Sequence, residues 1–567
     1  MILNKIFSFL NKQQKKHFFI LLALMLVSTL LELMGLNIIF LLVNFFINDN
    51  FQSSFNFVER FLSTESLESV LLIKYLAIIL VVIFLIKFIF QIFFFRFQSL
   101  YIFNLQTYFQ NLLLKKYISQ DYLFFVYRNS SEFIRNIRDI VHYYTGGVVN
   151  SLLNFFAEII LVIGILAFLF YYNFLAAIFA LIFFSIIFSF YFMVIKNLSY
   201  KLGLNRQNLN FTSLKNLSQI INGIKDIKIY NSENFYLEKF KSTNSNLNSV
   251  RSKLVFLSLL PRIIFEFALI IILAVFIFNS GNFGFEQAES LELLSIFAIA
   301  AARLLPSMAK IFGSLQTFKA NTSSINLLEK EFKLKSITEL NNKSNVKFDK
   351  EVSFENISFA YNNSDNKILE NIDLKINKNK KIGIMGQSGS GKSTLLDILF
   401  GFLKPSEGAI KIDGNLSDNG IFNLETGPGY ISQEPFLLDD TIRNNIVFGF
   451  DEGNNERVKQ VLQKVNLYDY IKSLPDKHET VIGERGSRLS GGQAQRIVIA
   501  RCLYRNPQIL IFDEATSSLD VKNENLIMET IKENLNDLTL VIVSHNQNTL
   551  KICDIIYKLE NKKISKL

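Results

Sequence analysis

A glycine-rich run in the second half of the chain has the residue types and spacing of a phosphate-binding loop. It lies between an apolar strand candidate, 381–385, and a helix candidate that starts near residue 395. Glycines let the backbone curl so that its N–H groups, together with the start of the helix, face phosphate oxygens. Lys392 is expected to reach the outer phosphates, and the Ser393 hydroxyl to take a Mg²⁺ position. The run consists of Gly386, Gln387, Ser388, Gly389, Ser390, Gly391, Lys392, Ser393 and Thr394.

Two adjacent carboxylates close a second apolar run, 509–514, which reads Ile-Leu-Ile-Phe-Asp-Glu. Such a run is typical of a buried parallel strand, and ligands of open α/β sheets gather at the carboxyl ends of these strands. Asp513 is placed to hold Mg²⁺ through water, which leaves Glu514 to polarise an attacking water. One acid at a strand end often has a structural role, but solubility does not readily explain two adjacent acids there.

A third cluster, 489–493, directly precedes a helical run, 494–504. Its backbone N–H groups and the helix dipole favour a second set of phosphate oxygens. The phosphate loop already takes this position on its own nucleotide, so the economical arrangement places the cluster against ATP bound to a second copy of the domain. The residues expected to act in this way are Ser490, Gly491, Gly492 and Gln493.

With these motifs in this order, residues 350–567 resemble the nucleotide-binding domain of ATP-binding cassette (ABC) transporters. In that family the phosphate loop is called Walker A, the acids Asp513 and Glu514 close Walker B, and 489–493 is the signature. The resemblance implies an α/β P-loop fold, ATP and Mg²⁺ as cofactors, and a homodimer with two equivalent ATP sites.

The resemblance also implies roles for residues outside the three clusters. Tyr361 should stack on adenine, Gln433 should sense Mg²⁺ and touch the membrane domain, and His545 should contact the γ-phosphate and act in catalysis with Glu514. The D-loop of the family matches 517–520. One departure is Asn546, because an Arg commonly follows the histidine.

The first half of the chain has the composition of a membrane domain. Half of the 567 residues are hydrophobic and 19% are charged, which argues against a purely soluble protein. Six apolar stretches are long enough to cross a bilayer as helices, at 18–47, 71–95, 147–171, 174–195, 254–278 and 291–312. The predicted fold is therefore multidomain: an all-α six-span transmembrane domain over 1–325, a linker over 326–349, and the nucleotide-binding domain over 350–567.

Basic residues predict the orientation of these spans. The segments expected on one side carry 20 Lys and Arg, whereas the alternate connections carry only Arg60. This places both termini and the nucleotide-binding domain in the cytoplasm, and the resemblance implies a multi-pass protein of a bacterial inner (plasma) membrane. It also accounts for the net charge of +10 without a nucleic-acid partner. Residues 48–70 are either an amphipathic helix on the outer face or a collapsed hydrophobic loop.

Several ionisable residues lie within or beside the apolar stretches. Charge at membrane depth is costly, so such side chains usually face a bundle interior or an aqueous cavity. Glu32 and Glu158 fit a cavity best, whereas structural pairing or snorkelling to the interface would explain Arg262 equally well. The candidate cavity residues are Glu32, Glu158, Arg262, Glu266 and Arg303.

One cassette behind one six-span domain resembles an exporter-type half-transporter. The resemblance implies two cytoplasmic extensions that end in coupling helices, near 129–137 and 221–230, and an X-loop at 480–486 that meets them. Importers usually place their spans on a separate chain, so import is the weaker interpretation.

Three features of the membrane half resemble the flippases that turn lipid-linked oligosaccharides across the inner membrane in bacterial N-glycosylation. They are Pro261-Arg262 with Glu266 four residues on, the run 303–307, and the possible helix within 48–70. The resemblance implies ATPase-driven export or flipping of an amphipathic, lipid-linked substrate. Open alternatives are other lipids, drugs or peptides, and, from a different class, an ATP-gated regulatory membrane protein.

Overall fold

The chain forms two compact units, each described here by itself. The computed structural model describes residues 2–47, 69–172, 174–279, 287–334, 346–361, 366–450, 454–515, 521–534 and 537–567. The helical unit comprises Met1–Gln120 and Tyr127–Ser336, and the α/β unit comprises Asp121–Val126 and Ile337–Leu567. The short segment 121–126 therefore leaves the helical unit, packs within the α/β unit, and returns.

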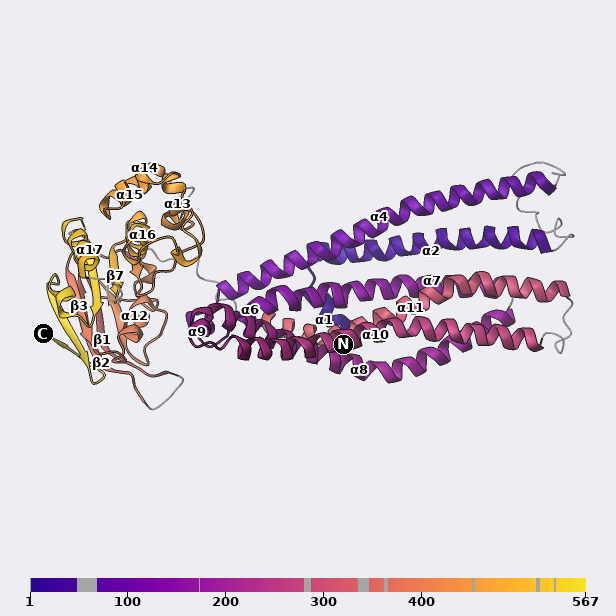
Figure 1. Ribbon diagram of the computed structural model, residues 1–567, viewed down its shortest axis with the longest axis horizontal. Helices are drawn as coiled ribbons and strands as arrows, with labels where there is room; N and C mark the ends of the chain where they lie inside the picture. Colours follow the sequence, from indigo (N-terminus) through magenta and orange to yellow (C-terminus); the bar gives the residue numbers. More distant parts are fainter. Residues whose placement is uncertain are drawn as a thin grey trace. The chain divides into compact units, whose positions relative to one another are not determined.

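Long helices build the helical unit, and Figure 1 shows them running side by side. The helix pairs α8/α10, α8/α11, α7/α11, α10/α11, α2/α4 and α2/α7 are in contact. A core of buried side chains, including Tyr191, Phe265 and Phe312, joins these helices. The elements are α1 (Ile2–Phe9), α2 (Lys12–Ile47), α4 (Ser69–Ile118), α6 (Ser130–Arg135), the π-helical turns η2 (Asn136–Ile140) and η3 (Tyr143–Val149), α7 (Asn150–Tyr172), α8 (Phe174–Asn222), α9 (Ile224–Ile229), α10 (Glu233–Asn279) and α11 (Gln287–Phe332).

The outward side chains of these helices indicate an apolar solvent. On α4, large apolar side chains such as Ile78, Val81 and Phe88 are exposed, and a helix that is apolar all round suits a membrane. Among the described residues, three helices are long and apolar enough to cross one: Lys12–Leu42, Lys74–Ile118 and Ser130–Tyr172.

The predicted spans 18–47, 71–95 and 147–171 lie mostly within these three helices. The other three predicted spans lie within α8, α10 and α11 and stay predictions as membrane crossings. Residues 48–68, which hold most of the expected outer-face segment, lie outside the described residues.

Two sheets organise the α/β unit. The larger has the strand order β10-β9-β3-β8-β7-β6, in which β3, β6, β7, β8 and β9 are parallel and β10 is antiparallel to β9. The smaller sheet is antiparallel, with the order β2-β1-β4-β5. The strands are β1 (Glu351–Phe359), β2 (Leu369–Asn377), β3 (Lys381–Gly386), β4 (Glu407–Ile412), β5 (Asn415–Leu416), β6 (Gly429–Ile431), β7 (Ile509–Asp513), β8 (Thr539–Ser544), β9 (Ile555–Glu560) and β10 (Lys563–Lys566).

Helices cover the larger sheet and form a second layer. All of β8 and most of β7 are buried, as expected for parallel strands covered on both faces. The helices of this unit are α5 (Tyr122–Val126), α12 (Lys392–Phe400), α13 (Ile442–Val447), α14 (Asn455–Lys464), α15 (Tyr468–Ser473), α16 (Gly491–Tyr504), α17 (Val521–Asn534) and α18 (Gln547–Leu550). The predicted fold class, a helical region followed by an α/β domain, is thus confirmed.

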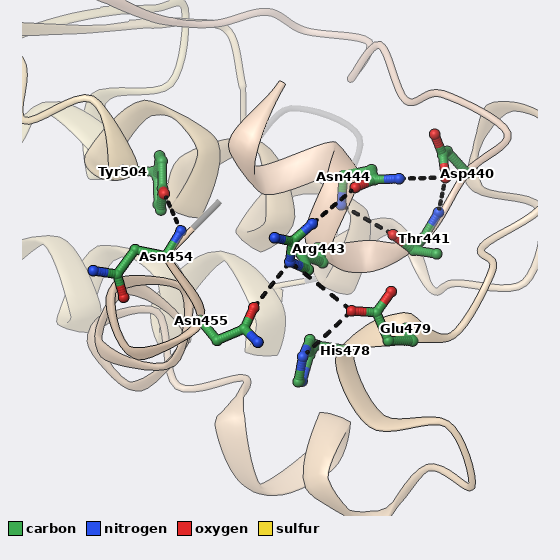
Figure 2. A network of polar contacts seen from close by, with 9 residues as sticks. All are labelled: Asp440, Thr441, Arg443, Asn444, Asn454, Asn455, His478, Glu479 and Tyr504. Carbon is green, nitrogen blue, oxygen red and sulfur yellow. Dashed lines mark hydrogen bonds and ion pairs between the residues drawn. The ribbon is translucent and has the colours of Figure 1, made fainter. Parts of the chain in front are cut away.

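A polar network fixes α13 to the segment before residues 480–486 (Figure 2). The Thr441 hydroxyl accepts a hydrogen bond from the Asn444 backbone N–H at 3.0 Å and so caps α13, and Thr441 also bridges to Val481. Arg443 donates to Asn455 at 2.9 Å and lies 3.9 Å from the Glu479 carboxylate. These contacts hold 480–486 on the helical layer that carries α16.

Helices α8 and α11 approach each other closely at Gly203. A Cβ built on Gly203 would lie 1.9 Å from the carbonyl oxygen of Ala320, which is far inside contact distance. Small residues allow such backbone-to-backbone packing in membrane bundles.

Replacing Gly203 by Ala should therefore destabilise the helical unit, because the added methyl meets backbone that cannot rotate away. Overpacking of this kind costs about 1–3 kcal/mol. The matched control is Gly313→Ala on α11, where the new Cβ would lie 3.9 Å from its nearest neighbour, the Ser258 carbonyl oxygen. The measurement is the temperature at which the detergent-solubilised protein stops being monodisperse. We expect this temperature to be several degrees lower for Gly203→Ala than for the parent and for Gly313→Ala. Equal temperatures for all three proteins would refute the packing argument.

Candidate functional site

The phosphate loop, Gly386–Thr394, forms at the carboxyl edge of the larger sheet. Gly389 and Gly391 have φ values of +79° and +103°, a left-handed conformation that glycine adopts without strain. Gly391 is also the N-cap of α12. A Cβ there would lie 3.0 Å from Leu369 Cδ2, so the backbone also needs glycine for space. The loop thus has the strand–turn–helix context that suits a phosphate.

The ammonium of Lys392 folds back over this loop. Its Nζ donates to the carbonyl oxygens of Gly386 at 2.9 Å and Gln387 at 3.0 Å, and forms an ion pair with Glu514 Oε1 at 3.0 Å. The lysine side chain is only 7% exposed, so its charge is neutralised by these partners. Ser393 is exposed at the start of α12, with its hydroxyl available to a ligand of the loop. The donor set therefore fits a nucleoside triphosphate.

Strand order brings the acidic pair to the same edge. Asp513 ends β7 opposite Val543 of β8, and the Glu514 backbone N–H donates to the Val543 carbonyl at 2.9 Å. Glu514 has φ +48°; its Oε2 lies 3.7 Å from Nδ1 of His545, just past β8. Lys392, Glu514 and His545 thus converge from three strand ends, as the sequence predicts for one site.

The environment of Asp513 suits a cation. Burial raises the pKa of its carboxyl, and the negative charge of Glu514 acts in the same direction, while a hydrogen bond from Tyr430 and the charge of Lys392 oppose the rise. A divalent cation favours the ionised form of a nearby acid. Ser393 and Asp513 therefore fit a Mg²⁺ ion.

Sequence reasoning missed two residues beside Asp513. The Tyr430 hydroxyl, on β6, donates to Asp513 Oδ2 at 3.0 Å. Asp397 lies on α12, where burial and the charge of Asp513 raise its pKa to about 6. The available signal for Asp397 was a single acid in the otherwise apolar stretch that follows the phosphate loop.

Tyr361 and Gln433 lie near this edge, but their predicted roles are not tested. The Tyr361 ring packs edge-to-face on Phe359 at 4.9 Å, and its hydroxyl lies 3.4 Å from that of Thr394. Gln433 is exposed just beyond β6, the neighbour of β7. Adenine stacking and Mg²⁺ sensing therefore stay predictions.

The signature residues form the start of α16. The Ser490 hydroxyl accepts from the Gln493 N–H at 3.3 Å, and Gln493 Oε1 accepts from the Ser490 N–H at 2.9 Å, which is a capping box. Gly491 is exposed and Gly492 is buried. Two of the four predicted trans residues thus also stabilise their own helix, and contact with a second nucleotide stays a prediction.

The remaining cassette motifs have mixed outcomes. The predicted D-loop, 517–520, lies outside the described residues. Asn546, the departure from the family pattern, caps α18: its side chain accepts from the Asn548 N–H at 3.0 Å, and its own N–H donates to Ser544 Oγ at 2.9 Å. The substitution for arginine therefore has a local structural reason.

The first coupling segment differs from the expected position. The range 129–137 lies in the helical unit, whereas 121–126 packs within the α/β unit. There Tyr122 stacks on Phe402 at 5.1 Å, and Leu123 packs on the core. The segment that packs within the α/β unit is therefore α5, a few residues earlier than expected, and it is held there by contacts of partly exposed side chains. α9 lies within the second expected range, 221–230.

The helical unit contains a cavity of about 620 Å³ between α2, α4, α7 and α11. Glu32, only 5% exposed, forms ion pairs with Lys87 Nζ at 2.9 Å and Arg303 Nε at 2.5 Å. Glu158 pairs with Lys310 at 2.8 Å. Buried charge is tolerated when it is paired, so the cavity residues Glu32, Glu158 and Arg303 are held in place by partners.

Two candidate cavity residues lie elsewhere. Arg262 and Glu266 form an exposed i,i+4 pair at 2.8 Å on α10, and the lining of this cavity includes neither of them. Sequence reasoning instead missed an amide cluster on the cavity wall. Gln98 Nε2 donates to Asn150 Oδ1 at 2.9 Å and to Asn154 Oδ1 at 2.8 Å. The signal was the four-residue spacing of the two asparagines.

Comparison with known proteins agrees with this geometry. Residues 369–517 match the family model described as ABC transporter. The chain is 31% identical over 375 residues to heterocyst differentiation ATP-binding protein HepA of Nostoc, covering 64% of this chain and 59% of that protein. It is 30% identical over 379 residues to the ATP-dependent lipid A-core flippase of Francisella tularensis, covering 65% and 61%. The chain thus spans about 60% of the length of these curated relatives.

A third relative is the putative multidrug export ATP-binding/permease protein YgaD of Bacillus subtilis, 38% identical over 211 residues, covering 37% of this chain and 36% of that protein. A solved bacterial Atm1-family ABC exporter with ATP bound superimposes with a TM-score of 0.77 at 20% identity, covering 98% of this chain and 94% of that one. Residues 369–517 therefore match the ABC transporter family model, and the whole chain shares the fold of the solved ABC exporter.

Proposed function

We propose that this protein is an ATPase that drives transport across a membrane. The observation that carries the proposal is the convergence of Lys392, Glu514 and His545, with Asp513, at the edge of one sheet. Lys392 would exchange its carbonyl partners for phosphate oxygens. Glu514 would then be free of the ammonium and accept a proton from the attacking water.

A Mg²⁺ ion fits beside the phosphates in this proposal. Ser393, Gln433 and Asp513 (through water) would hold it, and the ion would neutralise charge on the phosphate oxygens. Within the protein, the Tyr430 hydroxyl already lowers the pKa of Asp513 against the effect of burial. The pKa of Asp513 is still raised, so a bound cation would stabilise its ionised form.

The functional unit proposed is a homodimer. The start of α16 is exposed, and Gly491 lies in its first turn. Backbone N–H groups at this position suit a phosphate, while the phosphate loop would hold the nucleotide of the same chain. A second copy would supply that phosphate, with Ser490, Gly491, Gly492 and Gln493 facing its nucleotide. ATP would then favour the closed dimer by differential binding, as any ligand-driven change requires.

We place the protein in a bacterial inner membrane, with the α/β unit and both termini in the cytoplasm. The charge asymmetry between alternate connections supports this orientation. The exposed apolar surfaces of α2 and α4 support contact with lipid.

The substrate proposed is amphipathic and lipid-linked, with a lipid-linked oligosaccharide as the preferred candidate. The cavity supports it, because amides such as Gln98 and charges such as Arg303 suit a polar head group, while the surrounding helices suit an acyl or prenyl chain. Names of relatives include a lipid A-core flippase and a multidrug exporter, so other lipids and drugs are the alternatives, and an ATP-gated regulator is a more distant one.

Replacing Glu514 by Gln should stop ATP hydrolysis while ATP still binds, because the amide keeps the size of the side chain but cannot accept the proton. General-base catalysis typically contributes about 10²–10⁴-fold, so we expect turnover of purified protein to fall by at least that range. The measurement is phosphate release beside equilibrium binding of a fluorescent ATP analogue.

The matched control for that experiment is Glu456→Gln, an exposed acid on α14 whose partner is Lys459 of the same helix. It should keep ATP hydrolysis within about twofold of parent when substrate is absent. Parent-level hydrolysis by Glu514→Gln would remove Glu514 as the base.

The cavity hypothesis predicts different effects for two arginines. Arg303→Ala removes a cation from the cavity, whereas Arg262→Ala removes one from an exposed pair on α10. In proteoliposomes that contain a lipid-linked oligosaccharide, we expect Arg303→Ala to lose ATP-dependent protection of the glycan from an external probe and Arg262→Ala to keep it.

Loss of protection in both variants, or in neither, would contradict the assignment of the cavity. No movement of the oligosaccharide lipid by the parent, together with clear movement of a lipid A-type lipid, would replace the preferred substrate and leave the transporter proposal intact. Hydrolysis without movement of any lipid or drug would favour the regulator.

A further inference from the structure

We propose that a row of four aromatic side chains makes the position of α5 control the carboxylate of Asp513. The aromatic row consists of Tyr122, Phe402, Phe400 and Tyr430. The inference rests on the proposed function, since it assigns positioning residues to the site that would hold Mg²⁺. Its last member, Tyr430, touches the acid, and its first member belongs to the segment that connects two parts of the helical unit.

Successive members of the row are in ring contact. Tyr122 stacks on Phe402 with centroids 5.1 Å apart and planes at 27°. Phe402 stacks on Phe400 at 5.5 Å, and Phe400 meets Tyr430 edge-on at 5.1 Å and 82°. The Tyr430 hydroxyl then donates to Asp513 Oδ2 at 3.0 Å. These separations lie in the range of favourable aromatic pairs.

The backbone fixes the middle of the row. Phe400 is the last residue of α12, the helix that begins at Lys392, and is 5% exposed. Gly401 follows in a left-handed conformation, with a built Cβ 2.2 Å from the Asn419 carbonyl oxygen. The Phe402 N–H donates to the Asp397 carbonyl at 2.8 Å. The backbone at Phe402 is therefore held on the phosphate-loop helix, so a shift of α5 would reach the row through the ring of Phe402.

The far end of the row is held by the sheet. Tyr430 is the central residue of β6 and pairs in parallel register with Ile511, two residues before Asp513. Its backbone is thus fixed relative to Asp513, while its hydroxyl direction depends on the ring that Phe400 contacts. A hydrogen bond to an ionised acid is among the stronger ones in a protein, so the orientation of this ring affects how Asp513 meets a cation.

The near end of the row is joined through the backbone to the helical unit. Residues 121–126 are joined by peptide bonds to Gln120 and Tyr127, which belong to that unit. Any displacement there must bend the two junctions or shift α5, and Tyr122 and Leu123 pack α5 on the α/β unit. The row is the set of contacts by which such a shift would reach Asp513.

A claim of coupling requires a double-mutant cycle rather than a chain of contacts. The readout is Mn²⁺ binding in the presence of ATP, followed by the EPR signal of free Mn²⁺, on the full chain carrying Glu514→Gln so that ATP persists. Tyr430→Phe keeps the ring and removes the hydroxyl donor. We expect its dissociation constant for Mn²⁺ to rise about three- to tenfold, the scale of one ordinary hydrogen bond.

Phe402→Leu interrupts the row while Tyr430 keeps its hydroxyl. We expect a rise in the same direction, about two- to threefold, the scale of one aromatic pair. Added to Tyr430→Phe it should produce no further rise, because the effect passes through the hydroxyl. Tyr122→Leu, on α5, should reproduce Phe402→Leu and serves in its place if that variant does not fold.

The matched control is Phe422→Leu. Phe422 also contacts Phe402, at 6.4 Å, has the same 38% exposure, and does not belong to the row. Its Mn²⁺ affinity should equal that of the parent. Three results would overturn the proposal. The Mn²⁺ dissociation constant could rise equally in Phe422→Leu, the effects of Phe402→Leu and Tyr430→Phe could be additive, or neither of these two variants could change the dissociation constant. A chain that binds no ATP overturns the proposed function itself, and the coupling with it.

Discussion

The nucleotide site depends on β8 lying between β3 and β7 in one parallel sheet. Parallel strands end at the same edge, so the loop after β3, the acids after β7 and the histidine after β8 meet although they are far apart in sequence. The Lys392–Glu514 ion pair at 3.0 Å is the direct result of this order. A different strand order would separate the lysine from the acid.

The helical unit obeys a second constraint, the cost of charge among apolar helices. The buried Glu32 has two cationic partners and the partly buried Glu158 has one, so both acids are paired within the bundle. The same residues line a cavity, where a polar ligand could compete for the cations. The membrane half thus combines a surface suited to lipid with an interior suited to a polar group.

Local motifs were predicted well from sequence because their chemistry is local. The phosphate loop needs its glycines and its lysine within nine residues, and a strand that ends in two acids marks its own edge. Contacts that depend on tertiary packing were not predicted. Tyr430 reaches Asp513 only because β6 lies beside β7, and the pairing of Glu158 with Lys310 requires α7 to meet α11.

The coupling segment and the cavity illustrate the same limit. Short helices such as α5 are too short to show a clear hydrophobic period in the sequence. The contact between Tyr122 and Phe402, which only the structure shows, identifies the segment that packs within the α/β unit. Arg262 and Glu266 matched a pattern of charge in apolar sequence, yet they pair with each other on α10. Sequence showed that charges were present but not which way their helices faced.

The most direct test of the account is a cryo-EM structure of the full chain with a non-hydrolysable ATP analogue and Mg²⁺. The account predicts two chains, with triphosphate against the phosphate loop and Lys392 Nζ moved from the Gly386 and Gln387 carbonyls to phosphate oxygens. It also predicts residues 490–493 of one chain facing the nucleotide of the other. Nucleotide bound elsewhere, or Lys392 still on those carbonyls and on Glu514, would contradict it.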